Sequence, residues 1–142
     1  MDSKSANTSN SENKVPLILV VEDDEDNQLL LAYTVTMFGW KYVLAVDAVK
    51  TISLVKKQRP SLILLDIVLP DISGLQIAMM LKSQPATRNI PLIAVTGLTA
   101  KRDLNLISAA GFNDYVSKPF YLEELYRAIA MQLNLTSFGQ LI

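Results

Sequence analysis

The sequence predicts an α/β fold, in which a five-stranded parallel sheet is doubly wound by helices into a three-layer sandwich. After Pro16, short apolar runs alternate with longer amphipathic stretches, which is typical of successive βα units. LILL at 62–65 and LIAV at 92–95 are apolar throughout, as expected of central parallel strands that are buried on both faces. Together these two patterns favour a parallel sheet with helices on both sides.

Ten elements follow one another along the chain. We expect strands at 17–21, 41–46, 61–66, 91–95 and 113–117. We expect helices at about 26–38, 48–58, 74–83, 100–110 and 121–134. Gly39 and Gly111 follow helices as C-terminal stops, whereas Pro60 and Pro91 stand at strand starts. No internal repeat or second core interrupts this order.

The helix at 26–38 carries more apolar residues than one helix face can hold, so some of them are candidates for partner contact. In the helix at 121–134 the apolar stripe Leu122, Leu125, Ile129 and Leu133 predicts core packing. Three further residues of that helix are better candidates for partner contact if they are exposed: Tyr121, Tyr126 and Met131.

The length of 142 residues and 50% hydrophobic content fit one domain with a substantial core. We expect it at 15–135, between a polar, disordered tail at 1–14 and a short tail at 136–142. The net charge of -1 gives no attraction to nucleic acid or to an anionic membrane, and no stretch has the length of a membrane span. We therefore expect neither nucleic acid nor membrane as a partner.

The chain contains no cysteine and no histidine. The lack of cysteine excludes disulfides, thiolate metal sites and thiol catalysis, and it is compatible with a cytoplasmic location. The lack of histidine excludes a Ser/His/Asp triad and histidine metal ligands. It also excludes any role of this chain as a phosphohistidine donor.

Polar side chains follow four of the predicted strands at the point where each strand ends. They are three acids, a lone carboxylate, a hydroxyl and an ammonium: Glu22, Asp23 and Asp24, then Asp66, Thr96 and Lys118. If the strands are parallel neighbours, these groups meet at the carboxyl edge of the sheet, where open α/β sheets bind ligands.

The acidic cluster has two interpretations. Acids near a helix start can cap the helix and complement its dipole, and Asp24 or Asp26 could do so here. Asp66 favours the other interpretation, because a carboxylate at the end of an apolar strand is costly to bury unless it is paired. Clustered carboxylates are the hard oxygen ligands that Mg²⁺ prefers, and a carboxylate can also attack phosphorus to give an acyl phosphate.

Thr96 and Lys118 would complete such a phosphoryl site. An ammonium and a hydroxyl at fixed positions stabilise the charge on phosphoryl oxygens. Taken alone, Thr96 could bond the backbone at a strand end, and Lys118 could be a solvated surface charge. Their placement together with Asp66 favours the phosphoryl site.

These segments resemble the receiver domain of bacterial two-component response regulators, in particular stand-alone receivers of the chemotaxis type. The motifs are VVEDDEDN at 20–27, LILLDIVLPDISGL at 62–75, LIAVTGLTA at 92–100 and DYVSKPF at 114–120, and the resemblance covers about residues 16–134. It implies a flavodoxin-like fold with strand order 2-1-3-4-5.

The resemblance also implies a role for each site residue. Asp66 would be the phospho-acceptor, and Asp23 a direct Mg²⁺ ligand. Glu22 would bind through water, and the backbone carbonyl of Val68 would be a further ligand. Mn²⁺ is an alternative ion. Three more positions complete the set: Thr96 and Tyr115 as switch residues, and Lys118 as the family's lysine, in a cis peptide bond with Pro119.

By the same resemblance, the chain would be a phosphorylation-activated signalling switch and not a turnover enzyme. It would take its phosphoryl group from a sensor histidine kinase or a histidine phosphotransfer protein. It would signal to a downstream protein through the 100–134 face, with a phosphorylation-dependent dimer as a further candidate assembly. Neither Val68 nor Leu98 can position an attacking water, which predicts slow self-dephosphorylation.

Other functions compete with this prediction. A phosphatase of the haloacid dehalogenase type needs a second Asp two positions after the first, where Val68 stands. A dinucleotide-binding module needs a glycine-rich turn after the first strand, where this chain has EDDEDN. A receiver-like scaffold that is never phosphorylated, and a receiver detached from a hybrid histidine kinase, both stay open.

Overall fold

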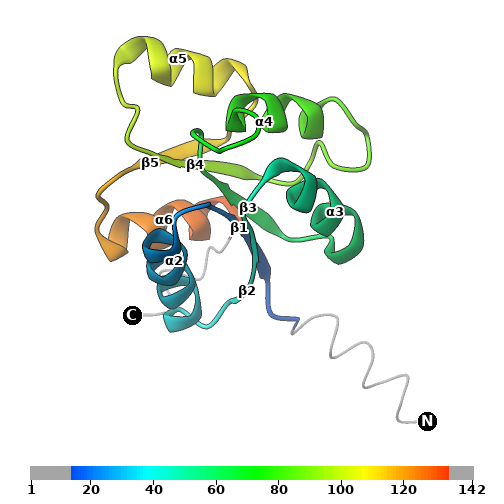
Figure 1. Cartoon of the computed structure of the whole chain (residues 1–142). Helices are drawn as coiled ribbons and strands as arrows, with labels where there is room; N and C mark the ends of the chain where they lie inside the picture. Colours follow the sequence, from blue (N-terminus) through cyan, green and yellow to red (C-terminus); the bar gives the residue numbers. More distant parts are fainter. Residues whose placement is uncertain (1–13, 135–142) are drawn as a thin grey trace, which may run out of the picture.

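The computed structural model describes residues 14–134, in which five strands and five helices alternate (Figure 1). The strands are β1 (Leu17–Val21), β2 (Lys41–Ala45), β3 (Leu62–Leu65), β4 (Leu92–Thr96) and β5 (Asp114–Ser117). The helices are α2 (Glu25–Met37), α3 (Ala48–Gln58), α4 (Gly74–Lys82), α5 (Lys101–Ala109) and α6 (Leu122–Gln132). Every predicted element is present, and its ends lie within two residues of the predicted ones.

The sheet is parallel throughout, with strand order β2-β1-β3-β4-β5, which confirms the doubly wound, flavodoxin-like topology. The register brings the strand ends level. Val21 lies beside Leu65, so that Glu22 and Asp66 follow at the same height. Thr96 lies beside Ser117, so that Lys118 follows directly. The register alone therefore places the polar strand-end residues at one edge.

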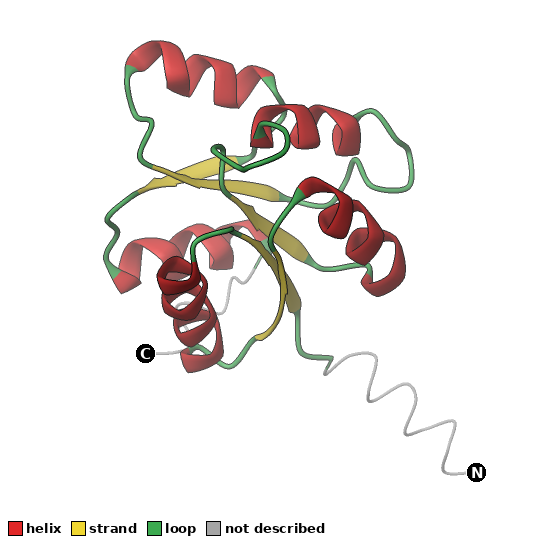
Figure 2. Ribbon diagram, viewed as in Figure 1, coloured by secondary structure: helices red, strands yellow, loops and turns green. Residues whose placement is uncertain are grey.

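Helices cover both faces of the sheet (Figure 2). Side chains that alternate along the strands divide the core in two. Leu19, Ile63 and Ala94 pack in the half that includes buried residues of α3, α4 and α5. Ile18 and Leu64 pack in the other half, with residues of α2 and α6. This three-layer arrangement is the one that the continuous apolar strands predict.

The predicted helix stops and the apolar excess of the first helix are visible in the structure. Gly39 and Gly111 have φ values of 89° and 105°, in the region that favours glycine, which confirms them as C-terminal stops. In α2, Leu31 and Val35 are buried. The apolar excess of the helix lies at the surface, at Leu29, Leu30, Tyr33 and Met37.

The expected tails lie outside the described residues, except for Lys14, which is exposed and belongs to no helix or strand. This applies to the disorder expected for 1–14 and to the short tail expected at 136–142. Within residues 14–134, no helix combines the length and the apolar composition that a membrane crossing requires.

Candidate phosphoryl-acceptor site

A pocket of about 540 Å³ opens at the carboxyl edge of the sheet, where β1, β3, β4 and β5 end. It brings together every predicted site residue except Tyr115. The residues that line it are Glu22, Asp23, Asp24, Asn27, Asp66, Val68, Thr96, Gly97, Leu98 and Lys118. Residues from four separate segments of the chain thus share one site.

Glu22 is almost fully buried, with 1% of its surface exposed. Its two carboxylate oxygens accept hydrogen bonds from Lys118 Nζ at 2.9 Å and from the Asp24 backbone N–H at 3.1 Å. Its backbone carbonyl accepts a bond of 2.7 Å from Gln28 Nε2. Burial raises the pKa of Glu22, and the hydrogen bond from Lys118 opposes that effect. The side chain is therefore fixed in place with both oxygens engaged.

Asp66 is also buried, immediately after β3. Its Oδ1 accepts a hydrogen bond of 3.2 Å from the Val68 backbone N–H, and its Oδ2 lies 3.3 Å from Lys118 Nζ. Burial alone would lower the pKa of the Lys118 ammonium, but its bonds to Glu22 and its attraction to Asp66 raise that pKa above its ordinary value. Lys118 is consequently charged across the physiological range.

The acidic residues are arranged so that a metal ion can be held. Glu22, Asp23 and Asp66 each offer a carboxylate oxygen, and these oxygens lie within 4.8 Å of one another. Among the residues that line the pocket, Lys118 is the only cation against four carboxylates, counting Asp24. Such a surplus of hard anionic oxygens fits Mg²⁺, which takes carboxylates and completes its octahedron with waters.

Asp24 also serves the structural role that the sequence left open, because its side chain accepts a bond of 2.9 Å from the Asn27 backbone N–H as the N-cap of α2. Among these neighbouring acids, Asp24 caps the helix, whereas Glu22 and Asp23 belong to the group that could hold a metal ion.

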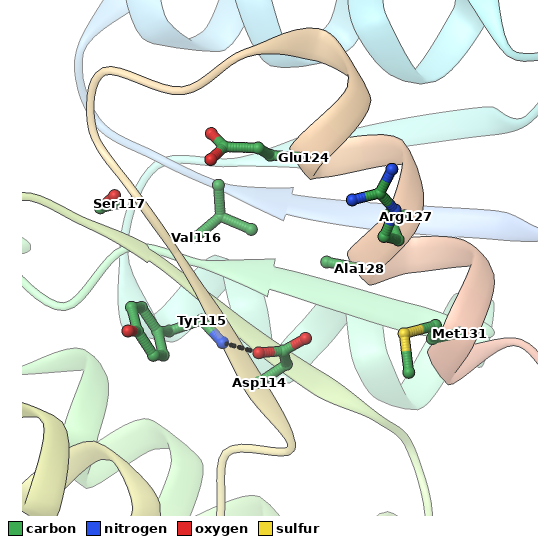
Figure 3. Close-up of a pocket in the computed structure, with 8 residues that line it drawn as sticks. All are labelled: Asp114, Tyr115, Val116, Ser117, Glu124, Arg127, Ala128 and Met131. Carbon is green, nitrogen blue, oxygen red and sulfur yellow. Dashed lines mark hydrogen bonds between the residues drawn. The ribbon is translucent and has the colours of Figure 1, made fainter.

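Thr96 ends β4 with its side chain buried, and its hydroxyl oxygen accepts a hydrogen bond of 3.0 Å from the Leu98 backbone N–H. Tyr115 lies apart from the pocket. It is 41% exposed and lines a separate groove of about 350 Å³ between β5 and α6 (Figure 3). The Lys118–Pro119 peptide is cis, in line with the sequence-based expectation.

Sequence reasoning did not identify two further contributors to the site. Asn27 lines the pocket from the first turn of α2, a position that its spacing after the strand-end acids could have indicated. Gly74 packs so closely under the loop after β3 that a Cβ at this position would collide with the Asp66 backbone carbonyl oxygen. Only the folded chain reveals that close approach, because Gly74 is eight residues away from Asp66.

Comparisons with known proteins agree with this geometry. A family model for the response regulator receiver domain matches residues 18–130. The polar-differentiation response regulator DivK of Brucella anthropi is 34% identical over 117 residues, which cover 82% of this chain and 95% of that protein.

Two solved structures extend the comparison. The receiver domain of the sensor histidine kinase PA1611 of Pseudomonas aeruginosa, solved with a magnesium ion coordinated in its active site cleft, is 30% identical, with a TM-score of 0.79 over 84% of this chain and 98% of that chain. The signal receiver domain of a histidine kinase from Syntrophus aciditrophicus is 26% identical, with a TM-score of 0.79 over 87% and 94% of the two chains. This chain belongs to the response regulator receiver domain family, whose members are phosphorylation-activated signalling switches.

Proposed function

We propose that Asp66 is the residue that accepts the phosphoryl group. One observation carries this assignment: the Asp66 carboxylate lies in a pocket beside two further acids, with the Lys118 ammonium 3.3 Å from its Oδ2. A carboxylate can act as a nucleophile toward phosphorus, and a neighbouring ammonium can stabilise the negative charge of the phosphoryl oxygens.

The transfer needs a donor from another protein. The chain contains no histidine, so a phosphohistidine must come from a sensor histidine kinase or a histidine phosphotransfer protein. An Asp66 oxygen forms the new bond to phosphorus while the bond from phosphorus to the donor imidazole nitrogen breaks, and that nitrogen keeps the electron pair. Lys118 would hold one phosphoryl oxygen, and Thr96 would donate its hydroxyl to another.

The acidic cluster would hold the divalent ion of the reaction. Asp23 and Asp66 would bind Mg²⁺ directly, Glu22 through a water, and Val68 through its backbone carbonyl, with Mn²⁺ as the alternative ion. When bound, the ion supplies positive charge next to the transferred phosphoryl oxygens. The magnesium coordinated in the similar PA1611 receiver supports this assignment.

The response to phosphorylation would start at Thr96. The Thr96 hydroxyl accepts a hydrogen bond from the Leu98 backbone N–H, so a movement of this side chain toward a phosphoryl oxygen would pull on the loop that follows β4. The loop at 97–100 would rearrange as a result, and the exposed ring of Tyr115 would turn inward. The change would reach the 100–134 face, where the chain would bind a downstream protein or a second phosphorylated copy.

The surface of that face is partly apolar. Tyr121 and Met131 are 75% and 65% exposed and are available for such contacts. Figure 3 shows Tyr115 on one side of β5, with Arg127 and Met131 of α6 across the strand. Tyr126 is less suited to this role, because its ring stacks on Trp40 with the ring centroids 5.5 Å apart.

The assignment is tested by intact-protein mass after incubation with acetyl phosphate and Mg²⁺. We expect a gain of one phosphoryl group that disappears in Asp66→Asn and in the presence of a chelator. An equal gain in Asp66→Asn would overturn the assignment. No gain in the wild type, under conditions that modify another receiver, would favour the second candidate, a receiver-like scaffold that binds partners without phosphorylation.

The proposal also covers the type of activity, the bounds of the domain and the kind of protein to which the receiver belongs. The chain is a cytoplasmic switch that assists its own phosphorylation and its slow dephosphorylation, and it is not a turnover enzyme. Its receiver domain extends over 15–135. The similar proteins include a response regulator as well as receivers of histidine kinases, so both a stand-alone receiver and one detached from a hybrid kinase are consistent with them.

A further inference from the structure

A second groove lies at the end of the sheet opposite to Asp66, between α3 and α4. It has a volume of about 310 Å³ and continues into a hollow of about 210 Å³ beside Pro60, at the start of β3. The two cavities share four lining residues, Val55, Lys56, Ala86 and Thr87. They form one continuous groove, which we call the α3–α4 groove.

The floor of the α3–α4 groove is apolar. Ile52 and Val55 of α3 face Leu81 of α4 across it. Met80 lies at its edge with 47% of its surface exposed. Exposed methionine is an adaptable contact for apolar side chains of a partner, because its thioether chain is flexible and polarizable. The floor can therefore bury an apolar side chain supplied from outside.

The wall formed by 83–90 is held by hydrogen bonds. Thr87 Oγ1 donates to the Leu81 carbonyl at 2.6 Å. Lys82 Nζ donates to the carbonyls of Arg88 and Ile90, both at 3.0 Å. With its wall fixed from both ends, the groove is preformed, and binding costs little ordering of the protein.

The rim of the groove is basic. Lys56 and Arg59 line it, and no acidic residue does. The two helices and the loop that form the groove, 48–58 and 74–90, contain no Asp or Glu, although the chain as a whole has a net charge of -1. Positive charge is thus concentrated around an apolar groove in an otherwise slightly acidic protein.

Arg59 has a second unusual property. It ends α3 with a φ of 48°, in the left-handed region where glycine is the usual residue. An arginine in that conformation is less stable than a glycine. Arg59 therefore places a positive charge at the groove at some cost in stability. A backbone outlier of this kind motivates the hypothesis that the residue has a function.

We propose that the α3–α4 groove binds an acidic segment of a partner protein that inserts an apolar side chain between the helices. The apolar floor and basic rim match an amphipathic helix that carries Glu or Asp beside Leu or Phe anchors. The lining contains no aromatic side chain on which a nucleic-acid base could stack. The groove lies at the opposite end of the sheet and shares no lining residue with the pocket around Asp66, so the proposal does not require phosphorylation of Asp66.

The test uses the whole chain labelled with ¹⁵N and short helical peptides that carry Leu or Phe at i and i+4 with Glu elsewhere. We expect amide shifts confined to α3, α4 and 83–90, which saturate as peptide is added. A peptide of the same design with Lys in place of Glu should not bind. Absence of any saturable shift up to millimolar peptide, or shifts centred on another surface, would overturn the proposal.

Two groove variants and one control sharpen the test. Lys56→Glu should weaken peptide binding about tenfold, and Lys50→Glu, the same charge change on α3 but outside the lining of the groove, should leave it nearly unchanged. Arg59→Gly should weaken binding severalfold while raising the melting temperature, because the left-handed residue becomes glycine. Equal affinity in all three variants and wild type would contradict a basic rim that recognises acidic peptide.

The remaining outcomes separate this proposal from others. Asp66→Asn should bind the peptide as tightly as wild type, so a failure of the phospho-acceptor assignment would leave this result intact. Binding of the groove to vesicles of anionic phospholipid in preference to peptide would overturn the proposal in favour of a membrane surface. Concentration-dependent shifts of the same amides without peptide would overturn it in favour of a second copy of the chain.

Discussion

Two partly buried lysines at opposite ends of the sheet show how differently the same side chain can be used. Lys118, at the carboxyl edge, pairs with the carboxylates of Glu22 and Asp66, and its pKa is raised. Lys82, at the other edge, donates to two backbone carbonyls and to Asn113 Oδ1, and burial lowers its pKa. The Lys82 ammonium lies among uncharged carbonyl oxygens and links separate segments of the fold. The Lys118 ammonium lies among carboxylates and balances negative charge at the candidate phosphoryl-acceptor site.

The surroundings of the two lysines differ in the same way. Asn113 Oδ1 also accepts a hydrogen bond from the Leu92 backbone N–H. Lys82 therefore belongs to a network of uncharged acceptors at the starts of β4 and β5. Around Lys118 the pocket keeps more negative than positive charge. We therefore expect changes near Lys82 to affect stability without affecting phosphorylation, and changes near Lys118 to affect both.

The largest effect is expected from the glycines that pack against each region. Gly74→Ala should lower the free energy of unfolding by roughly 3 kcal/mol and also slow phosphorylation, because the new Cβ meets the Asp66 backbone, which cannot yield easily. Gly111→Ala should cost about 1–2 kcal/mol through its positive φ and contact with Lys82, with the phosphorylation rate of the folded protein unchanged. Urea denaturation and acetyl phosphate kinetics measure both quantities.

Gly97→Ala is the matched control for the glycine pair, because no described atom beyond its chain neighbours lies within 4 Å of a Cβ placed there. It should leave the free energy of unfolding within about 0.5 kcal/mol of wild type. If Gly74→Ala proved as harmless as Gly97→Ala, the loop after β3 would not be rigid, and the proposed positioning of Asp66 would be wrong.

The lysines themselves give the next largest effect. Lys82→Met and Lys118→Met should each lower the free energy of unfolding by about 1–2 kcal/mol, because each removes the hydrogen bonds that its ammonium donates. Only Lys118→Met should lose phosphorylation by acetyl phosphate. Added Mg²⁺ should restore stability to Lys118→Met but not to Lys82→Met. Loss of phosphorylation in the folded Lys82→Met protein would contradict the proposal that Lys118 and not Lys82 takes part in phosphorylation.

A smaller effect separates two caps of α3. Asp47 caps the helix from its own N-terminus through the Lys50 backbone N–H, whereas Asp71 reaches Ala48 N–H at 2.9 Å from the loop that follows Asp66. Either change to Ala should lower stability, because a backbone N–H at the start of α3 loses its acceptor. Asp71→Ala alone should also weaken Mg²⁺ binding severalfold in calorimetry, because the loop that carries Val68 loses its anchor. Equal Mg²⁺ affinities in the two variants would make Asp71 a cap and nothing more.

The smallest expected effect is the pH dependence of the lysines. The folded pKa of Lys118 is raised above 10.5, so its contribution to stability is complete below that pH and is lost as pH rises through the folded value. The folded pKa of Lys82 is lowered, so the stability linked to its titration increases as pH rises from the folded pKa toward 10.5. The cost of Lys118→Met, measured from pH 8 upward, should shrink at the alkaline end. A cost that grew there would contradict the assigned direction.

The sequence predicted the fold closely because the central strands are short apolar runs and because glycines mark the ends of α2 and α5. It also predicted the meeting of Glu22, Asp66, Thr96 and Lys118, since a parallel sheet brings strand ends to one edge. The restraint that Gly74 places on Asp66 depends on packing between distant segments. Neither local pattern nor residue type carries that information.

The α3–α4 groove was likewise not predicted. Its lining alternates between two helices and a loop, so no single segment contains a recognisable motif. Its basic rim becomes apparent only when the charges of 48–59 and 74–90 are placed on one surface.

The central claim is that Asp66, of all the acids at this edge, receives the phosphoryl group, and site mapping tests it most directly. The protein is phosphorylated with acetyl phosphate and Mg²⁺, reduced with borohydride, which converts an aspartyl phosphate to homoserine, and its peptides are sequenced by mass spectrometry. We predict homoserine at position 66 and nowhere else. Homoserine at position 23 or 24 with Asp66 unmodified would contradict the assignment.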